Sequence, residues 1–372
     1  KVLVQGYKEG GILPKWPLAS SYTGCMVGYP AVSVLADLVA KDLAEGDMST
    51  WAEAGARSSV YREDLAEKFK GTRELDLITM HPYYKEKYGF VPADSVPESV
   101  SWGLEMAYED WCISQIAKKA GNMELANEYA KKAEYYKRYL DPETKMMRPV
   151  MGDGSFRTPF NPRYSSHMKS DYTEGNAFQW SFFAPHDMDN FIAAIGGKKE
   201  LETRLDTLFT TSSQIDGAEA SGDITGLIGQ YAHGNEPSHH MAYLYNWTDS
   251  PWKGQEYLDY IMQNFYTNEP DGIIGNEDCG QMSAWYVMSA LGFYQVSPGI
   301  PVYTLGRPMV NKASMHVKGG IFEIVATNNS PANKYVKEVK LNGKVLKAPF
   351  ISHSDIINGG KLEFIMTDQP VK

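Results

Sequence analysis

The sequence predicts a mainly α-helical protein, an α/α toroid or a bundle of antiparallel helix pairs, followed by a small antiparallel β region. From Pro30 to about Leu291, apolar residues recur at helical spacing in segments separated by Gly, Pro and Asn. After Pro298 the pattern changes to strict alternation of apolar and polar residues, which is typical of strands. We therefore predict a helical domain over 1–297 and a β region over 298–372.

Amphipathic spacing marks five helices most clearly, at 30–43, 98–121, 123–140, 198–209 and 251–266. Gly121 and Asn122 separate the second of these helices from the third. So short a connection between long helices predicts an antiparallel pair, the repeating unit of a toroid or a bundle.

Two long polar segments rich in aromatic residues, 142–172 and 211–238, carry no clear helical or strand pattern. Loops of this length inside a compact domain often line a functional site. In the β region, alternation marks strands within 321–329, 335–346 and 361–368. The Asn342-Gly343 pair inside the second of these predicts a hairpin with a two-residue loop.

Composition limits the classes of partner. The 372 residues carry a net charge of −10, without a run of Lys and Arg, so a nucleic acid partner is not expected. No stretch approaches the roughly 20 apolar residues that insertion into a membrane requires. The three cysteines, Cys25, Cys112 and Cys279, lack the spacing of a zinc site or a disulfide framework, so we expect buried free thiols.

The chain begins with KVLVQGYKEGG, without an initiating Met and without the pattern of a signal peptide. We therefore expect a piece of a longer or processed product.

Three loop-to-helix junctions share one composition: DYTEGNAFQW at 171–180, HGNEPSHHMAYLYNW at 233–247 and DGIIGNEDCGQMSAW at 271–285. Each places an acid beside Gly and Asn just ahead of an aromatic helical run. Such residues often serve only as helix caps. Three matched junctions instead favour polar residues directed at one cavity.

Two carboxyl groups on separate elements suit the hydrolysis of a glycosidic bond. Glu174 has Tyr172, Phe178 and Trp180 nearby in sequence, and an apolar wall of this kind raises the pKa of a general acid. Asp278 lies in a polar turn at the start of a helix, where a carboxylate stays ionised and can act as a base.

A bound metal is the next possibility at these junctions. The segment EPSHH at 236–240 is not the HExxH pattern of zinc hydrolases, which argues against zinc. Asn235, Glu236 and Asp278 instead offer oxygen atoms, the ligands that calcium prefers.

Other polar residues have simpler interpretations. Glu105, Glu109 and Asp110 on the 98–121 helix are expected to form a solvated or ion-paired face. His186 and Asp187 are expected to cap a helix that begins near Met188.

With these junctions in view, the sequence resembles the calcium-dependent exo-α-mannosidases of glycoside hydrolase family 92. Six segments carry the resemblance, in order: GGILPKWPLASSYTGCMVGYPAVSVLAD, YTEGNAFQWSFFAPHD, HGNEPSHHMAYLYN, PDGIIGNEDCGQMSAWYVMSALGFYQVSPG, YTLGRP and LNG. The resemblance implies an inverting hydrolase in which an N-terminal β-sandwich packs on an (α/α)6 barrel. It also implies Ca²⁺ at the base of the mannose-binding subsite.

The resemblance implies roles for individual residues in the hydrolysis. Glu174 corresponds to the general acid and Asp278 to the general base, and the two carboxyl groups should lie roughly 6.5 to 9.5 Å apart, as inversion requires. Asn276 stands where the family often has a second carboxylate, so the partner of the base differs here.

The remaining matched residues concern binding. Asn235, Glu236 and Asp278 correspond to the neighbourhood of calcium. The resemblance also assigns four residues to substrate binding: Glu236, which is near the calcium as well, His233 and His239, which would lie beside the sugar hydroxyls, and Trp180.

On this resemblance the helical domain is a partial (α/α)6 toroid, incomplete at its N-terminal side, and the full-length protein carries the β-sandwich. The expected substrates are mannose-rich N-glycans or mannans, and the expected location is secreted, periplasmic or on the surface of a bacterium. Two alternatives remain open. One is an inactive or glycan-binding piece, and the other is an unrelated toroid enzyme, such as a polysaccharide lyase with a Tyr or His base.

Overall fold

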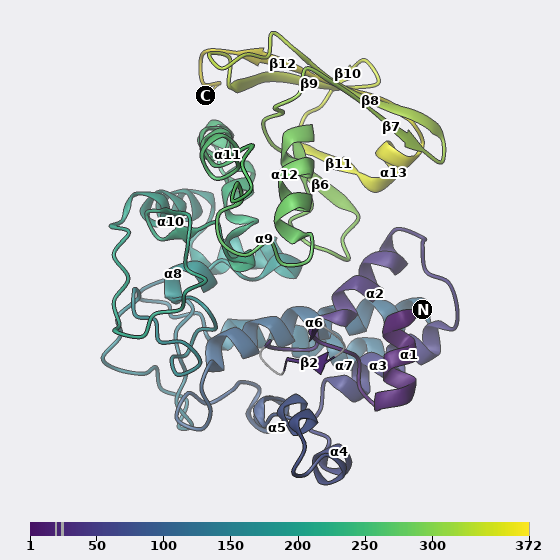
Figure 1. Ribbon diagram of the computed structural model, residues 1–372, viewed down its shortest axis with the longest axis vertical. Helices are drawn as coiled ribbons and strands as arrows, with labels where there is room; N and C mark the ends of the chain where they lie inside the picture. The colour runs from purple at the N-terminus through teal and green to yellow at the C-terminus, as the bar shows by residue number, and fades with distance from the viewer. Residues whose placement is uncertain (19–20, 24–25, 372) are drawn as a thin grey trace. The chain divides into compact units, whose positions relative to one another are not determined.

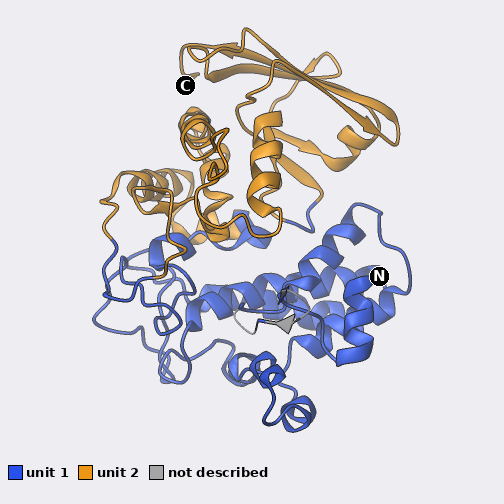
Figure 2. Cartoon of the chain, in the orientation of Figure 1, with its two compact units in different colours: residues 1–188, 215–220, 298–300 blue, residues 189–214, 221–297, 301–372 orange. Residues whose placement is uncertain are grey.

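The computed structural model describes residues 1–18, 21–23 and 26–371, which form two compact units (Figures 1 and 2). Unit 1 comprises 1–188, 215–220 and 298–300, and unit 2 comprises 189–214, 221–297 and 301–372. This division differs from the predicted boundary at 297, because the helices that follow residue 188 belong to the same unit as the C-terminal strands.

Unit 1 is mainly helical. Its elements are α1 (Val2–Gly10), β1 (Pro17–Leu18), β2 (Ser21–Tyr22), α2 (Ala31–Ala40), α3 (Met48–Ser58), α4 (Glu63–Lys68), η1 (Arg73–Leu77), α5 (His81–Tyr88), α6 (Ser99–Lys119), α7 (Met123–Lys132), η2 (Ala133–Arg138), α8 (Ala177–Trp180) and η3 (Pro185–Asp187).

Helix α6 is the centre of unit 1 and packs against α2, α3 and α7 (Figure 1). The predicted pair of helices is confirmed: α6 ends at Lys119, and Asn122 caps α7 by accepting a hydrogen bond of 3.1 Å from the Leu125 N–H. The second helix of the pair is tighter than predicted, because its last turns form the 3₁₀ segment η2.

The prediction that the acids of α6 form a solvated or ion-paired face is confirmed for Asp110, which is ion-paired, whereas solvent exposure of Glu109 and Asp110 is wrong. Glu109 and Asp110 are both 0% exposed. Asp110 pairs with the Lys85 ammonium at 2.9 Å and accepts a hydrogen bond from the Tyr29 hydroxyl, whereas Glu109 accepts the Tyr29 N–H at 2.8 Å. Burial raises the pKa of both carboxyl groups, and burial also raises the pKa of Glu105 to about 8.

Unit 2 combines helices with most of the strands. Its elements are α9 (Met188–Ile195, which begins at the last residue of the first segment of unit 1), α10 (Lys198–Thr210), β3 (Leu227–Ile228), β4 (Tyr231–Ala232), η4 (Glu236–Ser238), η5 (Met241–Trp247), α11 (Pro251–Asn264), α12 (Gln281–Leu291), β5 (Phe293–Tyr294), β6 (Val302–Leu305), β7 (Lys312–Val317), β8 (Gly320–Thr327), β9 (Tyr335–Leu341), β10 (Lys344–Val345), β11 (Phe350–Ser352), α13 (His353–Ile357) and β12 (Gly360–Thr367).

The C-terminal strands form a five-stranded sheet in the order β10-β9-β12-β8-β7 and a three-stranded sheet in the order β11-β6-β5. The predicted hairpin is confirmed: Asn342 and Gly343 have φ of 50° and 78°, and Leu341 pairs with Lys344. The predicted antiparallel β region is confirmed in most of its strand pairs, with the exception that β12 runs parallel to β8. Between β8 and β12 the chain forms β9, β10, β11 and α13, and so long a connection permits parallel pairing.

The core of the β region follows the predicted alternation. Phe322 and Ile324 on β8 and Leu362 and Phe364 on β12 are all 0% exposed. The two residues of each pair lie two positions apart, so the side chains lie on the same face of the sheet.

The cysteine prediction is confirmed for Cys112, which is a buried free thiol, and is wrong for Cys279, which is exposed. Cys25 lies outside the described residues. In the described part of the chain, no helix has both the length and the apolar character needed to cross a membrane.

Candidate active site

The predicted site residues fall into two groups, one in each unit. Glu174 and Trp180 belong to unit 1. The group in unit 2 lies on the 233–239 and 276–278 segments and consists of His233, Asn235, Glu236, His239, Asn276 and Asp278.

Glu174 lies just before α8 in a left-handed backbone conformation, with φ of 48°. It is not the cap of that helix. Asn176 accepts the Phe178 N–H at 3.0 Å, and Gln179 accepts the Asn176 N–H at 2.7 Å, which completes a capping box. A left-handed non-glycine residue costs free energy, and such residues concentrate at functional sites. Capping therefore does not account for Glu174.

Backbone hydrogen bonds fix the loop that carries Glu174 to the start of α6. The Thr173 N–H donates to Ser101 Oγ at 2.8 Å, and the Val100 N–H donates to the Asp171 carbonyl at 3.0 Å. From the other side, the Trp180 indole N–H donates to the Thr173 carbonyl at 2.8 Å. Trp180 is only 3% exposed, and this burial favours a role in positioning the loop over direct contact with a sugar.

A partly buried ion pair stabilises the same loop. Asp171 accepts a hydrogen bond of 2.9 Å from Arg157 and one of 3.1 Å from the Ser99 hydroxyl. Burial, opposed by Arg157 and Ser99, raises the pKa of Asp171. Sequence reasoning did not single out these residues, although Asp171 begins the motif that contains Glu174.

In unit 2, Asp278 has φ of 54°, also in the left-handed region. The adjacent Glu277 takes the capping role, because its carboxylate accepts the Gly280 N–H at 2.6 Å and the Ser283 hydroxyl at 2.7 Å. The bond from Ser283 lowers the pKa of Glu277. Asp278 itself is exposed. The two adjacent acids thus have different surroundings, and Asp278 is the one left to face solvent or a ligand.

Asn276 contacts a residue that the sequence analysis missed. Its Nδ2 donates to Asp223 Oδ1 at 3.2 Å, and the Ser221 hydroxyl donates to the other oxygen of Asp223 at 2.7 Å. Asp223 belongs to the long polar loop at 211–238. The sequence analysis predicted that this loop lines a functional site, and that prediction was the only signal in the sequence that pointed to Asp223.

His233 and His239 form a buried network with both ring nitrogens occupied. His233 contacts the hydroxyls of Tyr231 and Tyr266, each at 2.8 Å. His239 accepts from Gln281 Nε2 at 3.1 Å and donates to the His233 carbonyl at 3.0 Å. Burial lowers the pKa of His239 to about 4, and burial also lowers the pKa of His233 well below its ordinary value.

This network joins the 231–239 segment to the start of α12. The Tyr266 hydroxyl donates to the Met282 carbonyl at 3.2 Å, and the Trp285 indole donates to the His239 carbonyl at 3.0 Å. The two histidines therefore position the helix that follows Asp278. Because their nitrogens are already occupied, they are poorly placed to act as the base of a lyase or to bind sugar hydroxyls directly.

The residues predicted to bind calcium offer only oxygen atoms or amides. Asn235 is buried, Glu236 is half-buried and Asp278 is exposed. Among the described residues, no three His, Cys, Asp or Glu side chains are grouped so as to hold a metal ion. Calcium accepts amide, hydroxyl, carbonyl and water oxygens besides carboxylates. The buried Thr225 Oγ1, which lacks a hydrogen-bond partner, is one such oxygen beside the Gly234 backbone. The donor types therefore fit a hard cation better than zinc.

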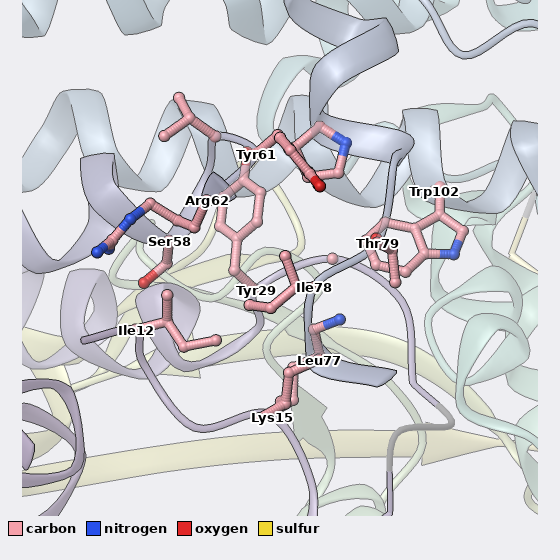
Figure 3. Close-up of a pocket in the computed structure, with 13 residues that line it drawn as sticks. Ile12, Lys15, Tyr29, Ser58, Tyr61, Arg62, Leu77, Ile78, Thr79 and Trp102 are labelled. Atoms are coloured by element: carbon pink, nitrogen blue, oxygen red, sulfur yellow. The ribbon is translucent and has the colours of Figure 1, made fainter. Parts of the chain in front are cut away.

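A cavity in unit 1 is not a second candidate for the sugar site (Figure 3). Its lining includes Lys15, Tyr29, Arg62 and Trp102, and the Lys15 ammonium lies 4.4 Å from the centroid of the Trp102 ring. The cavity holds about 20 Å³, room for about one water molecule. None of the predicted site residues lines it.

Comparison with known proteins agrees with the motifs. Residues 1–368 match the Glycosyl hydrolase family 92 catalytic domain. The structure is similar to that of the family GH92 α-mannosidase BT3965 from Bacteroides thetaiotaomicron in complex with mannoimidazole, with 39% identity and a TM-score of 0.87 over 99% of this chain and 47% of that one. It is also similar to the inverting mannosidase BT2199 of the same organism, with 31% identity and a TM-score of 0.85 over 99% of this chain and 49% of that one.

A curated relative, an uncharacterized secreted glycosidase of Arthroderma benhamiae, is 23% identical over 98% of this chain and 48% of its own length. The chain thus spans about half the length of the relatives that it matches. Because the match to the family domain covers residues 1–368, the chain belongs to glycosyl hydrolase family 92.

Proposed function

We propose that the protein is an inverting, calcium-dependent exo-α-mannosidase that removes terminal mannose from mannose-rich N-glycans or mannans. The observation that carries this proposal is the conformation of two acids. Glu174 and Asp278 both adopt left-handed backbones, and other side chains perform the capping at both junctions. The similarity to two bacterial mannosidases supports mannose as the sugar.

In the proposed reaction, Glu174 donates its proton to the glycosidic oxygen as the bond from that oxygen to the anomeric carbon breaks. Asp278 removes a proton from a water molecule, whose oxygen attacks the anomeric carbon from the opposite face. The products are a free alcohol on the remaining glycan and mannose of inverted configuration. Glu174 ends ionised and Asp278 ends protonated, so exchange with solvent restores both.

Asn235, Glu236 and Asp278 would hold the calcium ion. When bound, this ion would orient the hydroxyls of the terminal mannose and favour a flattened ring. Buried His233 and His239 hold the neighbouring backbone in place, and buried Trp180 holds the loop of Glu174. The similarity to a fungal glycosidase described as secreted supports a location outside the cytoplasm.

The test is to incubate the whole natural protein with an aryl α-mannoside in calcium and to follow the products by NMR. We expect free mannose that appears first as the β-anomer. Initial release of the α-anomer would contradict inversion. Absence of any mannose would contradict the proposed activity and favour a glycan-binding or inactive protein.

A further inference from the structure

The contact between Asn276 and Asp223 joins two loops that lie 53 residues apart in the sequence. Asp223 receives a hydrogen bond on each carboxylate oxygen, one from Asn276 Nδ2 at 3.2 Å and one from the Ser221 hydroxyl at 2.7 Å. The carboxylate is therefore held at both ends. The oxygen and the nitrogen of a side-chain amide lie on opposite sides of its carbon atom. Because Asn276 Nδ2 donates to Asp223, Asn276 Oδ1 points away from Asp223.

Tight backbone packing holds these loops together. Thr225 Oγ1 lies so close to two glycines that a Cβ atom would come within 1.8 Å of it at Gly234 and within 2.7 Å of it at Gly275. The Gly234 N–H also donates to the Thr225 carbonyl at 3.1 Å. The loops that carry Asp223 and Asn276 therefore have little freedom to separate.

In the proposed reaction, the water molecule that attacks the anomeric carbon carries two hydrogens. Asp278 removes one of them, and the other needs an acceptor that fixes the direction of the attacking oxygen. Asn276 lies two residues before Asp278 and can offer such an acceptor only if its oxygen, and not its nitrogen, faces the water.

We propose that Asp223 is a positioning residue for hydrolysis, which fixes the side-chain amide of Asn276 so that Oδ1 accepts the second hydrogen of the attacking water. Asp223 thereby takes part in the base end of the site without touching the substrate. The proposal rests on the proposed function and deepens it.

An exchange of the two side chains tests this proposal. Asp223→Asn removes the charge that selects one orientation of the amide, and we expect kcat to fall about tenfold while KM changes by less than about twofold. Asn276→Asp places two carboxylates in contact, and we expect a similar or larger fall in kcat.

The double variant Asp223→Asn/Asn276→Asp reverses the donor and the acceptor. The amide at position 223 then donates to the carboxylate at position 276, whose second oxygen can still accept from the water. We expect kcat to recover to within about threefold of wild type, a strong departure from additivity. The matched control is Asp249→Asn, the same change at an exposed carboxylate of unit 2, with an unchanged kcat expected.

Two results would overturn the proposal: a kcat for Asp223→Asn within about twofold of wild type, or losses in the double variant that simply multiply. If Asp223→Asn does not fold, the comparison uses Asn276→Ala, which should lower kcat about tenfold as well. An unchanged kcat for Asn276→Ala would also overturn the proposal.

The wild-type enzyme is assayed first, so that failure of the proposed function is distinguished from failure of the proposed role of Asp223. Failure of the wild type to release mannose contradicts the proposed function, and the role of Asp223 falls with it. If the wild type releases mannose and Asp223→Asn keeps full kcat, only the proposed role of Asp223 is contradicted, and the proposed function stands.

Discussion

The indole N–H of Trp180 donates a hydrogen bond of 2.8 Å to the carbonyl oxygen of Thr173, the residue that immediately precedes Glu174. Both residues are buried, so water cannot replace this bond if the indole nitrogen is lost. The orientation of the proposed acid therefore depends on a side chain that lies six residues further along the chain.

Replacement of the Trp180 indole tests whether the orientation of Glu174 depends on its hydrogen bond. In Trp180→Phe we expect kcat to fall about 10-fold to 100-fold with little change in KM, because small displacements of a reacting group are costly. The control is Trp102→Phe, which alters another buried tryptophan of unit 1 outside the loop of Glu174. If both variants lose kcat equally, the bond to Thr173 has no specific role in positioning the acid.

Substrates with different leaving groups distinguish the acid from the base. In Glu174→Gln, cleavage of an alkyl mannoside should fall about 10²-fold to 10⁴-fold, whereas cleavage of a dinitrophenyl mannoside, whose leaving group needs no proton, should change far less. In Asp278→Asn, cleavage of both substrates should fall, because water must still be activated. Equal losses on both substrates in Glu174→Gln would contradict its role as the acid.

Removal of divalent ions tests whether mannose release requires calcium. A chelator should abolish mannose release by the whole natural protein, and calcium should restore it, because the predicted ligands offer hard oxygen atoms. Zinc should fail to restore activity, since it prefers nitrogen and sulfur ligands. Full turnover in an excess of chelator would remove the metal from the mechanism.

Because His186 is partly buried, we expect the free energy of unfolding to fall on acidification. Burial lowers its pKa from 6.5 to about 4, although the hydrogen bond to the Ala133 carbonyl opposes this effect. The unfolded chain therefore takes up a proton between about pH 6.5 and 4 that the folded chain does not bind, and stability falls as the pH falls through that window. A shift of this size corresponds to about 3 kcal/mol at most.

The measurement is the free energy of unfolding from pH 7.5 down to 4.5 by denaturant titration. His186→Gln cannot titrate, so its stability should depend less on pH over this range than that of the wild type. Identical pH dependence in the wild type and His186→Gln would exclude His186 as a source of acid sensitivity.

Local features of the sequence predicted local features of the structure. The helices around Gly121 and Asn122 form where apolar periodicity placed them, because that periodicity reflects the burial of one face. The hairpin at Asn342 and Gly343 was predictable because few other residues accept a left-handed backbone at two successive positions. The junctions at Glu174 and Asp278 were found by composition alone, without any knowledge of which residue caps each helix.

The acids of α6 show where this reasoning fails. Periodicity assigns polar residues to an outer face, but α6 is covered by other helices on several sides, so Glu109 and Asp110 are buried with Tyr29 and Lys85. These partners lie 80 and 25 residues away, and pairing over such distances leaves no local pattern.

By itself, the sequence determined the positions of the helices, the hairpin and the three polar junctions, because short-range sterics and the burial of apolar faces act within a few residues. The tertiary structure decided that His233 and His239 are buried and that Asp223 meets Asn276. Such contacts arise when distant loops pack together, and their energies depend on burial and geometry that neighbouring residues in the chain do not encode.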